Sequence, residues 1–212
     1  MNFKTKVGYY ISTTKGYTDA EVQQYIIDGC FDVIRKVEGI EGIQGILKFG
    51  TWSANITAQD YDIDEKRRIL LVKRNEIPAQ EVDPFKFNKY TDTDSIYYAD
   101  DTDPVYYRME NILTILPAPD TSGSGSARFL SLGYANSSDV DYSVTNYDGT
   151  SSIDSFPAEY YDHVLLYASH KIADALSHAY LEDDEDAELT QLMASRSSSL
   201  KAQYLEMFGA AE

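Results

Sequence analysis

One stretch of the chain, from about residue 109 to residue 179, restricts the fold more than any other. It holds an alternating apolar segment that ends at Pro117, a Gly/Ser-rich turn, and a second alternating segment from Ala127 to Ala135. Alternation with a period of two is typical of β-strands, and a proline stops a strand because it cannot donate to the ladder. A Ser-x-Pro sequence at Ser155 then opens a long amphipathic segment. The stretch therefore predicts antiparallel strands followed by a helix.

Segments on both sides of this stretch carry apolar residues at helical spacing. The first, residues 18–38, begins with Thr18 and Glu21 in the arrangement of a capping box, and its Gly29 indicates close packing. We expect it to end at the glycines that follow, which are Gly39, Gly42 and Gly45. Residues 155–208 predict two C-terminal helices, separated by the acidic run at residues 183–186.

Between these helices, residues 66–135 are rich in β-branched and aromatic side chains, which predicts a β insert. We expect residues 95–99 and 105–109 to form a hairpin, and residues 127–135 to return antiparallel after the strand at residues 111–117. A further strand is expected at residues 67–74. Residues 75–94 favour a long loop with one short strand near Phe85–Phe87.

Two further expectations concern the first part of the chain. Residues 1–17 are polar and predict a partly extended arm, and Trp52 is interpreted as a core anchor. From all of these elements we expect residues 1–212 to form a single α+β protomer. Its helical core would consist of one N-terminal and two C-terminal helices, with an inserted antiparallel β-sheet or small β-sandwich.

Charge limits the classes of partner. The chain has 35 acidic and 18 basic side chains, a net charge of −17. This balance argues against binding nucleic acid through its phosphates or docking on an anionic membrane, and it favours partners that are basic or contacted through apolar patches.

No apolar run approaches the length of a membrane span, the start of the chain lacks the apolar core of a signal peptide, and we expect a reducing, soluble compartment. Cys30, the single cysteine, is expected to be a buried hydrophobe.

No residue pattern indicates catalysis or a metal site. His163 and His170 are seven residues apart, whereas a zinc helix of the zincin kind uses a spacing of four, so we interpret them as solvated or interface histidines. The acidic run that starts at Asp60 opens like a calcium loop but has Glu65 at the glycine position and Leu71 at the position of the bidentate glutamate. We therefore predict no catalytic, cofactor or metal residues, and a protein that is not an enzyme.

The order of elements resembles the head-to-tail connector, or adaptor, proteins of tailed bacteriophages. The resemblance covers most of the chain and is carried by motifs of low specificity, none of which is a catalytic signature. They are Ile26–Ile34, the strand ending in Pro-x-Pro at Ile112–Pro119, Phe129–Tyr134, the helix opening Phe156–Tyr160, the alanine-rich Tyr167–Ala175, and Tyr204–Phe208. The long loop at residues 75–94 and the strong acidity depart from the pattern and leave the subfamily open, a short-tailed phage being the expectation.

The resemblance implies a structural virion protein, made in the cytoplasm of a bacterial host and placed in the neck. It implies a homo-oligomeric ring, of about twelve copies, seated on the portal protein and extending the DNA channel to other neck or tail proteins. DNA would pass without specific binding, because an acidic wall repels phosphates, and neither a cofactor nor a membrane is implied.

Two candidate interfaces follow from this resemblance. The apolar end of the last helix, with Leu200, Tyr204, Met207 and Phe208, is expected to contact the portal or a neighbouring copy, although it could equally pack only on the helix at residues 157–180. Deletion of residues 200–212 is then expected to abolish docking while the monomer stays folded. The tail-side candidates are loop residues, namely Phe85, Phe87, Ser122 and Gly123.

Two other function classes stay open. A tail-associated carbohydrate- or protein-binding β module would use exposed aromatic side chains on one sheet face, namely Trp52, Tyr97, Tyr98, Tyr106 and Tyr107. A hydrolase acting through acidic pairs would need a pocket with a carboxyl group whose pKa is raised.

Overall fold

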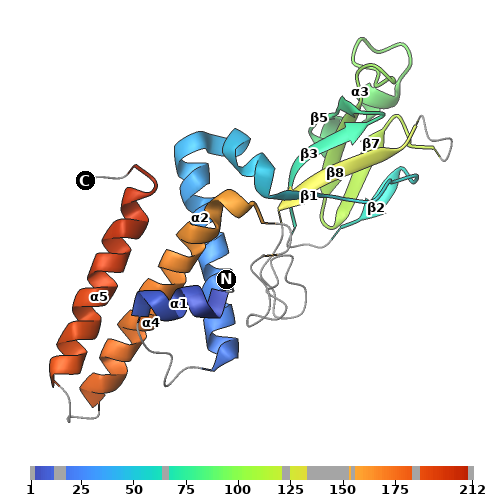
Figure 1. The fold of residues 1–212 in the computed structure, drawn as a ribbon. Coiled ribbons are helices and arrows are strands. Elements are labelled where there is room, and N and C mark those ends of the chain that lie inside the picture. Colours follow the sequence, from blue (N-terminus) through green and yellow to red (C-terminus); the bar gives the residue numbers. More distant parts are fainter. Residues whose placement is uncertain are drawn as a thin grey trace. The chain divides into compact units, whose positions relative to one another are not determined.

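The computed structural model describes residues 3–11, 18–63, 67–120, 125–132, 153, 156–182 and 187–209. Within these residues lie five α-helices and two four-stranded sheets, so the predicted α+β class is confirmed. The chain divides into a helical unit, residues 1–49 and 135–212, and a β unit, residues 50–134 (Figure 1). The β unit is inserted between two parts of the helical unit, and it begins at Gly50 rather than at residue 66.

The bounds of the elements are as follows. The helical unit contains α1 (Phe3–Ile11), α2 (Asp19–Ile46), the 3₁₀ turn η1 (Leu47–Phe49), the 3₁₀ turn η3 (Ala158–Tyr160), α4 (Tyr161–Glu182) and α5 (Ala187–Glu206). The β unit contains β1 (Gly50–Trp52), β2 (Asp60–Asp62), β3 (Arg68–Arg74), β4 (Ile77–Pro78), β5 (Gln80–Glu81), η2 (Pro84–Lys86), α3 (Asn88–Thr91), β6 (Val105–Met109), β7 (Ile112–Leu116) and β8 (Ala127–Leu132).

Helix α2 begins where the sequence predicts. The Thr18 hydroxyl accepts from the Glu21 backbone N–H, and the Glu21 carboxylate accepts from the Thr18 backbone N–H at 2.8 Å, which completes the capping box. The helix runs past Gly39 and is kinked at Gly42, whose φ of 68° lies in the left-handed region that glycine adopts without strain. The glycines therefore bend the helix and do not end it before Ile46.

The prediction of an extended N-terminal arm is wrong for residues 3–11, which form α1. Phe3, Val7 and Ile11 follow one another at intervals of four residues and are all fully buried. This spacing places the three side chains on one helical face. Helix α1 packs on α4, where the ring of Phe3 meets the edge of Tyr161 at 5.6 Å between centroids. The tertiary contact with α4 stabilises a helix that is too short to persist alone.

Helix α4 is the centre of the helical unit, because α1, α2 and α5 all pack on it. Its side chains Val164, Leu165, Ala168 and Ile172 are buried, as the apolar stripe predicts. It is preceded by a 3₁₀ turn from Ala158 to Tyr160, with Pro157 before that turn. The predicted caps at positions 154 and 155 lie outside the described residues.

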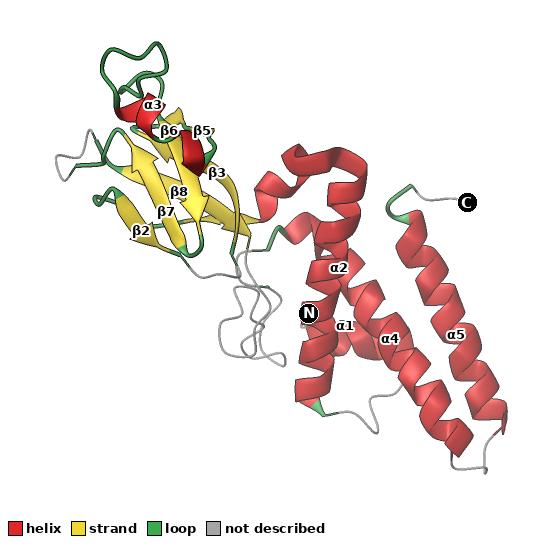
Figure 2. Ribbon diagram, turned by 180° about the vertical axis from the view of Figure 1, so that it is seen from behind, coloured by secondary structure: helices red, strands yellow, loops and turns green. Residues whose placement is uncertain are grey.

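The β unit is a small sandwich of two sheets, with strand orders β1-β8-β3-β4 and β2-β7-β6-β5 (Figure 2). Its core lies between the sheets and draws Val72 and Phe129 from the first, and Tyr106, Leu113 and Ile115 from the second. The predicted return of β8 after β7 is wrong in one respect, because β8 pairs with β1 and β3 in the opposite sheet.

Residues 95–99 are not a strand, so the hairpin predicted there is wrong. The antiparallel partner of β6 is β7, joined to it by a tight turn at Glu110 and Asn111, and β5 pairs with β6 in parallel on its other side. In residues 92–98 the side chains of Asp92 and Ser95 accept hydrogen bonds from backbone N–H groups two residues on, at 3.0 and 3.1 Å. Such local bonds compete with a strand ladder and outweigh the β-propensity of the tyrosines.

The loop predicted at residues 75–94 contains regular structure. Asn75 and Glu76 both have positive φ, and they join β3 to β4 in a two-residue hairpin. The strand expected near Phe85–Phe87 is wrong, because Asp83 caps a 3₁₀ turn that starts with Pro84. The sequence signal for the hairpin was weak, because glycine usually follows asparagine in such a turn.

Candidate interaction surfaces

The predicted interface at the end of α5 divides into buried and exposed residues. Leu200 is 1% exposed and Tyr204 is also buried, so both belong to the core of the helical unit. Met207 is exposed and Phe208 is half-buried in the turn after α5. Packing of α5 on α4, the alternative that the sequence left open, accounts for Leu200 and Tyr204, whereas Met207 and Phe208 stay available to a partner.

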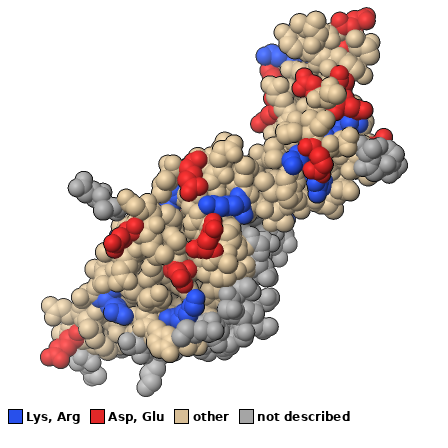
Figure 3. All heavy atoms as spheres, turned by 45° about the horizontal axis from the view of Figure 1, so that its top comes forward, with Lys and Arg blue, Asp and Glu red and all other residues tan. Residues whose placement is uncertain are grey.

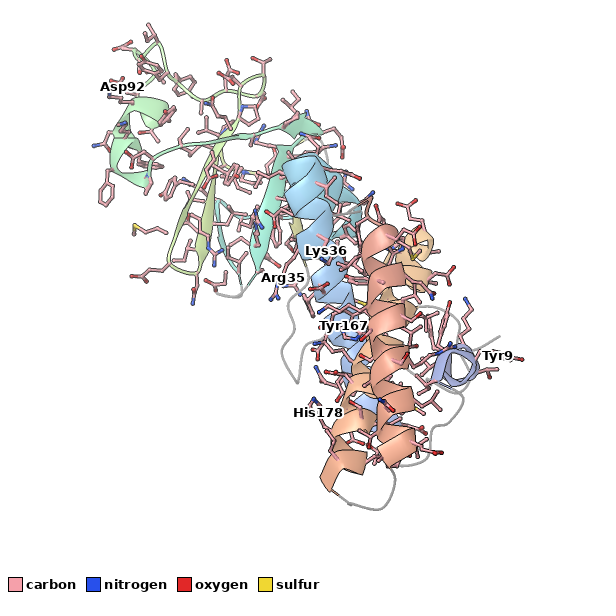
Figure 4. All side chains as sticks on the ribbon, turned by 90° about the vertical axis from the view of Figure 1, so that its left-hand side faces the viewer. Tyr9, Arg35, Lys36, Asp92, Tyr167 and His178 are labelled. Atoms are coloured by element: carbon pink, nitrogen blue, oxygen red, sulfur yellow. The ribbon has the colours of Figure 1, made fainter. Side chains whose placement is uncertain are left out.

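Tyr204 joins α5 to α2 and α4. Its hydroxyl donates to a carboxylate oxygen of Asp32, and its ring lies edge-on to Tyr167 and to Phe208 at 5.7 and 5.3 Å between centroids. Burial, together with the nearby Asp32 charge, raises the pKa of the Tyr204 hydroxyl. The ammonium of Lys36, on α2 (Figure 4), lies 5.6 Å from the Tyr204 ring centroid. These contacts fix the end of α5 in place.

A pocket of about 430 Å³, here called the C-terminal pocket, opens beside this turn. It is lined by apolar and aromatic side chains with two carboxylates among them, namely Val37, Ile40, Glu41, Glu159, Tyr160, His163, Met207 and Phe208. Ile40 and nearby Ile43 are both largely exposed. Lys48 lies 3.7 Å from Glu41 and 3.4 Å from Glu159, so the two acids share one cation.

His163 and His170, two of the three histidines of α4, are less solvated than their sequence positions suggest. His170 is buried, and its Nδ1 lies 3.0 Å from the Ser197 hydroxyl on α5, which also donates to the His170 carbonyl oxygen at 3.3 Å. His163 has a buried Nδ1 without a hydrogen-bond partner among the described residues. Burial lowers the pKa of both imidazoles, and the Lys171 charge lowers that of His170 further.

We expect the helical unit to lose stability as the pH falls below about 6.5, the ordinary pKa of histidine. Both imidazoles have a lowered pKa in the folded state. Between the lowered pKa of each folded imidazole and the ordinary pKa of about 6.5 in the unfolded chain, the unfolded chain therefore binds more protons than the folded chain. The stability that the neutral imidazoles contribute is complete above about pH 6.5 and is lost as the pH falls. Guanidinium unfolding at about pH 7.5 and about pH 5.5, followed by circular dichroism, measures the change.

Acidic groups also titrate at low pH, so the comparison needs variants. A H163Q/H170Q double variant should show a smaller loss on acidification than the natural chain, whereas H178Q, at an exposed position of α4, should show the same loss. An equal loss in all three proteins would assign the pH dependence to the carboxylates.

The β unit exposes its own apolar surface, here called the tip surface and formed by Phe85, Ile96, Tyr97 and Tyr98. Phe85 is 93% exposed and Ile96 is 91% exposed. Phe87, the other tail-side candidate of this segment, is half-buried and packs edge-on against Tyr107 at 5.5 Å. It also packs against a buried cluster of Ala99, Val105 and Leu116. Ser122 and Gly123 lie outside the described residues.

The aromatic platform of a binding module is not assembled as the sequence suggested. Tyr106 is buried, Tyr107 is half-buried, and Tyr97 and Tyr98 lie in the turns of the tip. Trp52 is 37% exposed, so its interpretation as a core anchor is wrong. It lies on the outer face of β1, where the cationic groups of Lys73 and Arg128 stand 5.2 and 5.3 Å from the centroid of the indole ring.

On the face drawn in Figure 3, acidic, basic and uncharged residues are interspersed in both units. Among the described residues there is no group of three or more His, Cys, Asp or Glu side chains that could hold a metal ion. Asp60, in the run that resembles a calcium loop, accepts from the Thr114 hydroxyl at 2.7 Å. Cys30 is buried as predicted, and burial raises the pKa of its thiol.

Comparisons with known proteins add no relative. Neither a protein-family model nor a curated protein matches this chain. Across the part of the chain that the structure describes, the helices are too short or too polar to cross a membrane.

Proposed function

We propose that this protein is a structural connector of a bacteriophage neck, which forms a ring on the portal protein and joins the capsid vertex to the tail. The observation that carries the proposal is that each unit exposes an apolar surface outside its own core. The helical unit presents Ile40 and Met207 at the C-terminal pocket and Ile43 three residues beyond Ile40, and the β unit presents the tip surface. Exposed apolar groups of this kind are typical of protein interfaces.

Two separate surfaces suit a protein that binds different neighbours at once. Each unit has its own core, so one surface can dock without disturbing the other. In this proposal the C-terminal pocket contacts the portal or the next copy, and the tip surface contacts a neck or tail protein. A chain that repeats head-to-tail around an axis closes into a ring, and about twelve copies are expected from the resemblance.

The charge of the chain supports a passive role toward DNA. At −17 per copy, a ring of about twelve copies carries a charge of about −200 before counterions bind. Such a ring would not retain DNA that passes through it, because it repels the phosphates. No cofactor is required, and catalysis has no part in the proposal.

The proposal predicts a change of mass on the portal. Native mass spectrometry of the protein alone, and with the portal protein of the same virus, should show a ring forming on the portal. An I43D/M207D variant should dock at least roughly ten-fold more weakly, because burying a carboxylate in an apolar contact is costly. Both side chains are exposed, so the variant should keep its fold.

Q191D is the matched control, since Gln191 is exposed near the other end of α5. It should dock like the natural chain and have the same thermal midpoint. A protein that stays monomeric with every preparation of that portal would refute the connector function. Docking that is the same for I43D/M207D and Q191D would instead assign the contact to another surface.

One observation favours a second function, a carbohydrate- or protein-binding β module. Trp52 is partly exposed and stands beside two cations on the outer face of β1. Indole rings of this kind stack on ligands. However, Glu76 pairs with both Lys73 and Arg128, so these cations already have an acidic partner. A glycan screen of the natural chain against a W52A variant tests this function.

A further inference from the structure

The tip surface is held by a structured scaffold. Beneath it lies a small core of Ala99, Val105 and Leu116, on which Val82, Phe87 and Tyr90 pack. The Phe85 backbone N–H donates to Asp83, and the Ala99 backbone N–H donates to the Tyr90 carbonyl oxygen, both at 3.0 Å. The exposed side chains therefore extend from fixed turns. Binding would not have to order these turns, which reduces its entropic cost.

The tip is acidic as well as apolar. Asp92, at the end of α3 (Figure 4), and Asp94, Asp100 and Asp103 are exposed, and none of the four has a cationic partner among the described residues. Asp83 and Asp101 are paired, with Lys86 at 3.6 Å and with Arg74 respectively. Hydrogen bonds from Thr102 and Asp103 lower the pKa of Asp100, so this group stays ionised at neutral pH.

A pocket of about 390 Å³ includes Tyr98, one of the four residues of the tip surface. It is lined by one aromatic ring, two carboxylates and small groups, namely Tyr98, Ala99, Asp100, Asp101, Thr102 and Pro117. Asp101 is already paired with Arg74, and one oxygen of Asp100 accepts hydrogen bonds from Thr102 and Asp103, so neither carboxylate offers both of its oxygens to a guanidinium group. An ammonium or guanidinium group can still contact an aromatic face and one free carboxylate oxygen together. The lining therefore suits the side chain of a lysine or an arginine.

We propose that the tip surface binds a basic protein surface, with a lysine or arginine side chain of the partner entering the pocket beside Tyr98 and with the exposed side chains of Phe85 and Ile96 packing against apolar groups of the same partner. Exposed apolar side chains, unpaired carboxylates and this pocket, all within residues 85–117 of the β unit, carry the proposal. It rests on the proposed function only in identifying the partner as the tail-side neighbour. The recognition itself needs neither a ring nor a portal.

A selection with defined probes tests the tip. Random disulfide-cyclised peptides are displayed and selected on the immobilised full-length protein, and the enriched peptides are synthesised and titrated. We expect sequences that combine lysine or arginine with large apolar residues. Their affinity should fall as salt is added, because part of the attraction is between charges.

Variants locate the bound peptides. An F85S/I96S variant should weaken binding at least roughly ten-fold, since it removes the apolar anchors. A D100N/D103N variant should weaken binding roughly two- to ten-fold and reduce its salt dependence. The side-chain amide oxygen that D100N introduces can still accept the hydrogen bonds of the turn. The matched control is E188Q/E206Q, which removes two exposed charges from α5 and should bind the peptides unchanged.

Each result of the peptide selection and of the variant titrations either supports or contradicts binding of a basic partner at the tip surface. Peptides that are neutral or acidic, peptides that bind F85S/I96S as well as the natural chain, or no enrichment at all would each overturn it. The thermal midpoint of each variant shows that the fold is kept. Portal docking is measured separately by native mass spectrometry, so a failed peptide selection and a failed connector function are distinguishable.

Discussion

Replacing Leu200 with alanine should lower the free energy of unfolding of the helical unit by about 2–5 kcal/mol. Leu200 is 1% exposed, in the interface of α5 with α4. Truncation removes buried apolar contacts and leaves a cavity that the packed helices fill only in part. Guanidinium unfolding followed by far-ultraviolet circular dichroism measures the change, because most of the helix lies in this unit.

Leu192 provides the control on the same helix. It is 60% exposed, so L192A should change the free energy of unfolding by no more than about 0.5 kcal/mol. Similar losses in L200A and L192A would mean that α5 does not pack as described.

The buried state of Leu200 and Tyr204 changes what a deletion can show. Removing residues 200–212 takes both side chains out of the core. Because domains are stable by only about 5–15 kcal/mol, we expect the truncated helical unit to unfold or loosen, and not to stay folded as the sequence suggested. Loss of docking by that deletion would not separate binding from folding, whereas the I43D/M207D variant does.

Replacing Gly29 with leucine should destabilise the helical unit by about 1–3 kcal/mol, although glycine is a poor helix former. A Cβ atom at this position would lie 3.1 Å from the ring of Tyr167 and 3.2 Å from both the side chain and the carbonyl oxygen of Val164. Tyr167 extends from α4 (Figure 4), so a larger side chain would force α2 and α4 apart. Chemical unfolding measures the loss.

Gly39, on the same helix, should respond in the opposite direction. A Cβ atom there would meet nothing within 4 Å, and the residue is exposed. G39L should therefore gain up to about 1 kcal/mol through helix propensity. If G29L lowers the free energy of unfolding and G39L raises it, the close approach of α2 to α4 is the reason that position 29 requires glycine. Equal effects would contradict it.

Elements that depend on neighbouring residues could be predicted from the sequence. The capping box at Thr18, the apolar stripe of α4, burial of Cys30 and the close packing at Gly29 all follow from the spacing of a few residues. The insertion of a β unit between helices also followed, because a period of two and a period near four are distinct along the chain.

Long-range pairing was decided only by the tertiary structure. The alternation of β7 and β8 identified two strands but could not assign them to opposite sheets, because the same pattern fits any partner that buries one face. Trp52 was placed in the core by its hydrophobicity, yet the register of β1 with β8 turns it outward beside Lys73 and Arg128.

The candidate surfaces show the same division. The sequence singled out Met207, Phe208 and Phe85, which the structure leaves accessible in part or in full, and it also chose Leu200 and Tyr204, which packing of α5 on α4 buries. An apolar residue on a helix is equally suited to a core and to an interface, since both remove it from water. The sequence by itself determined the α+β class and the apolar faces, and the tertiary structure decided which of those faces are left for a partner.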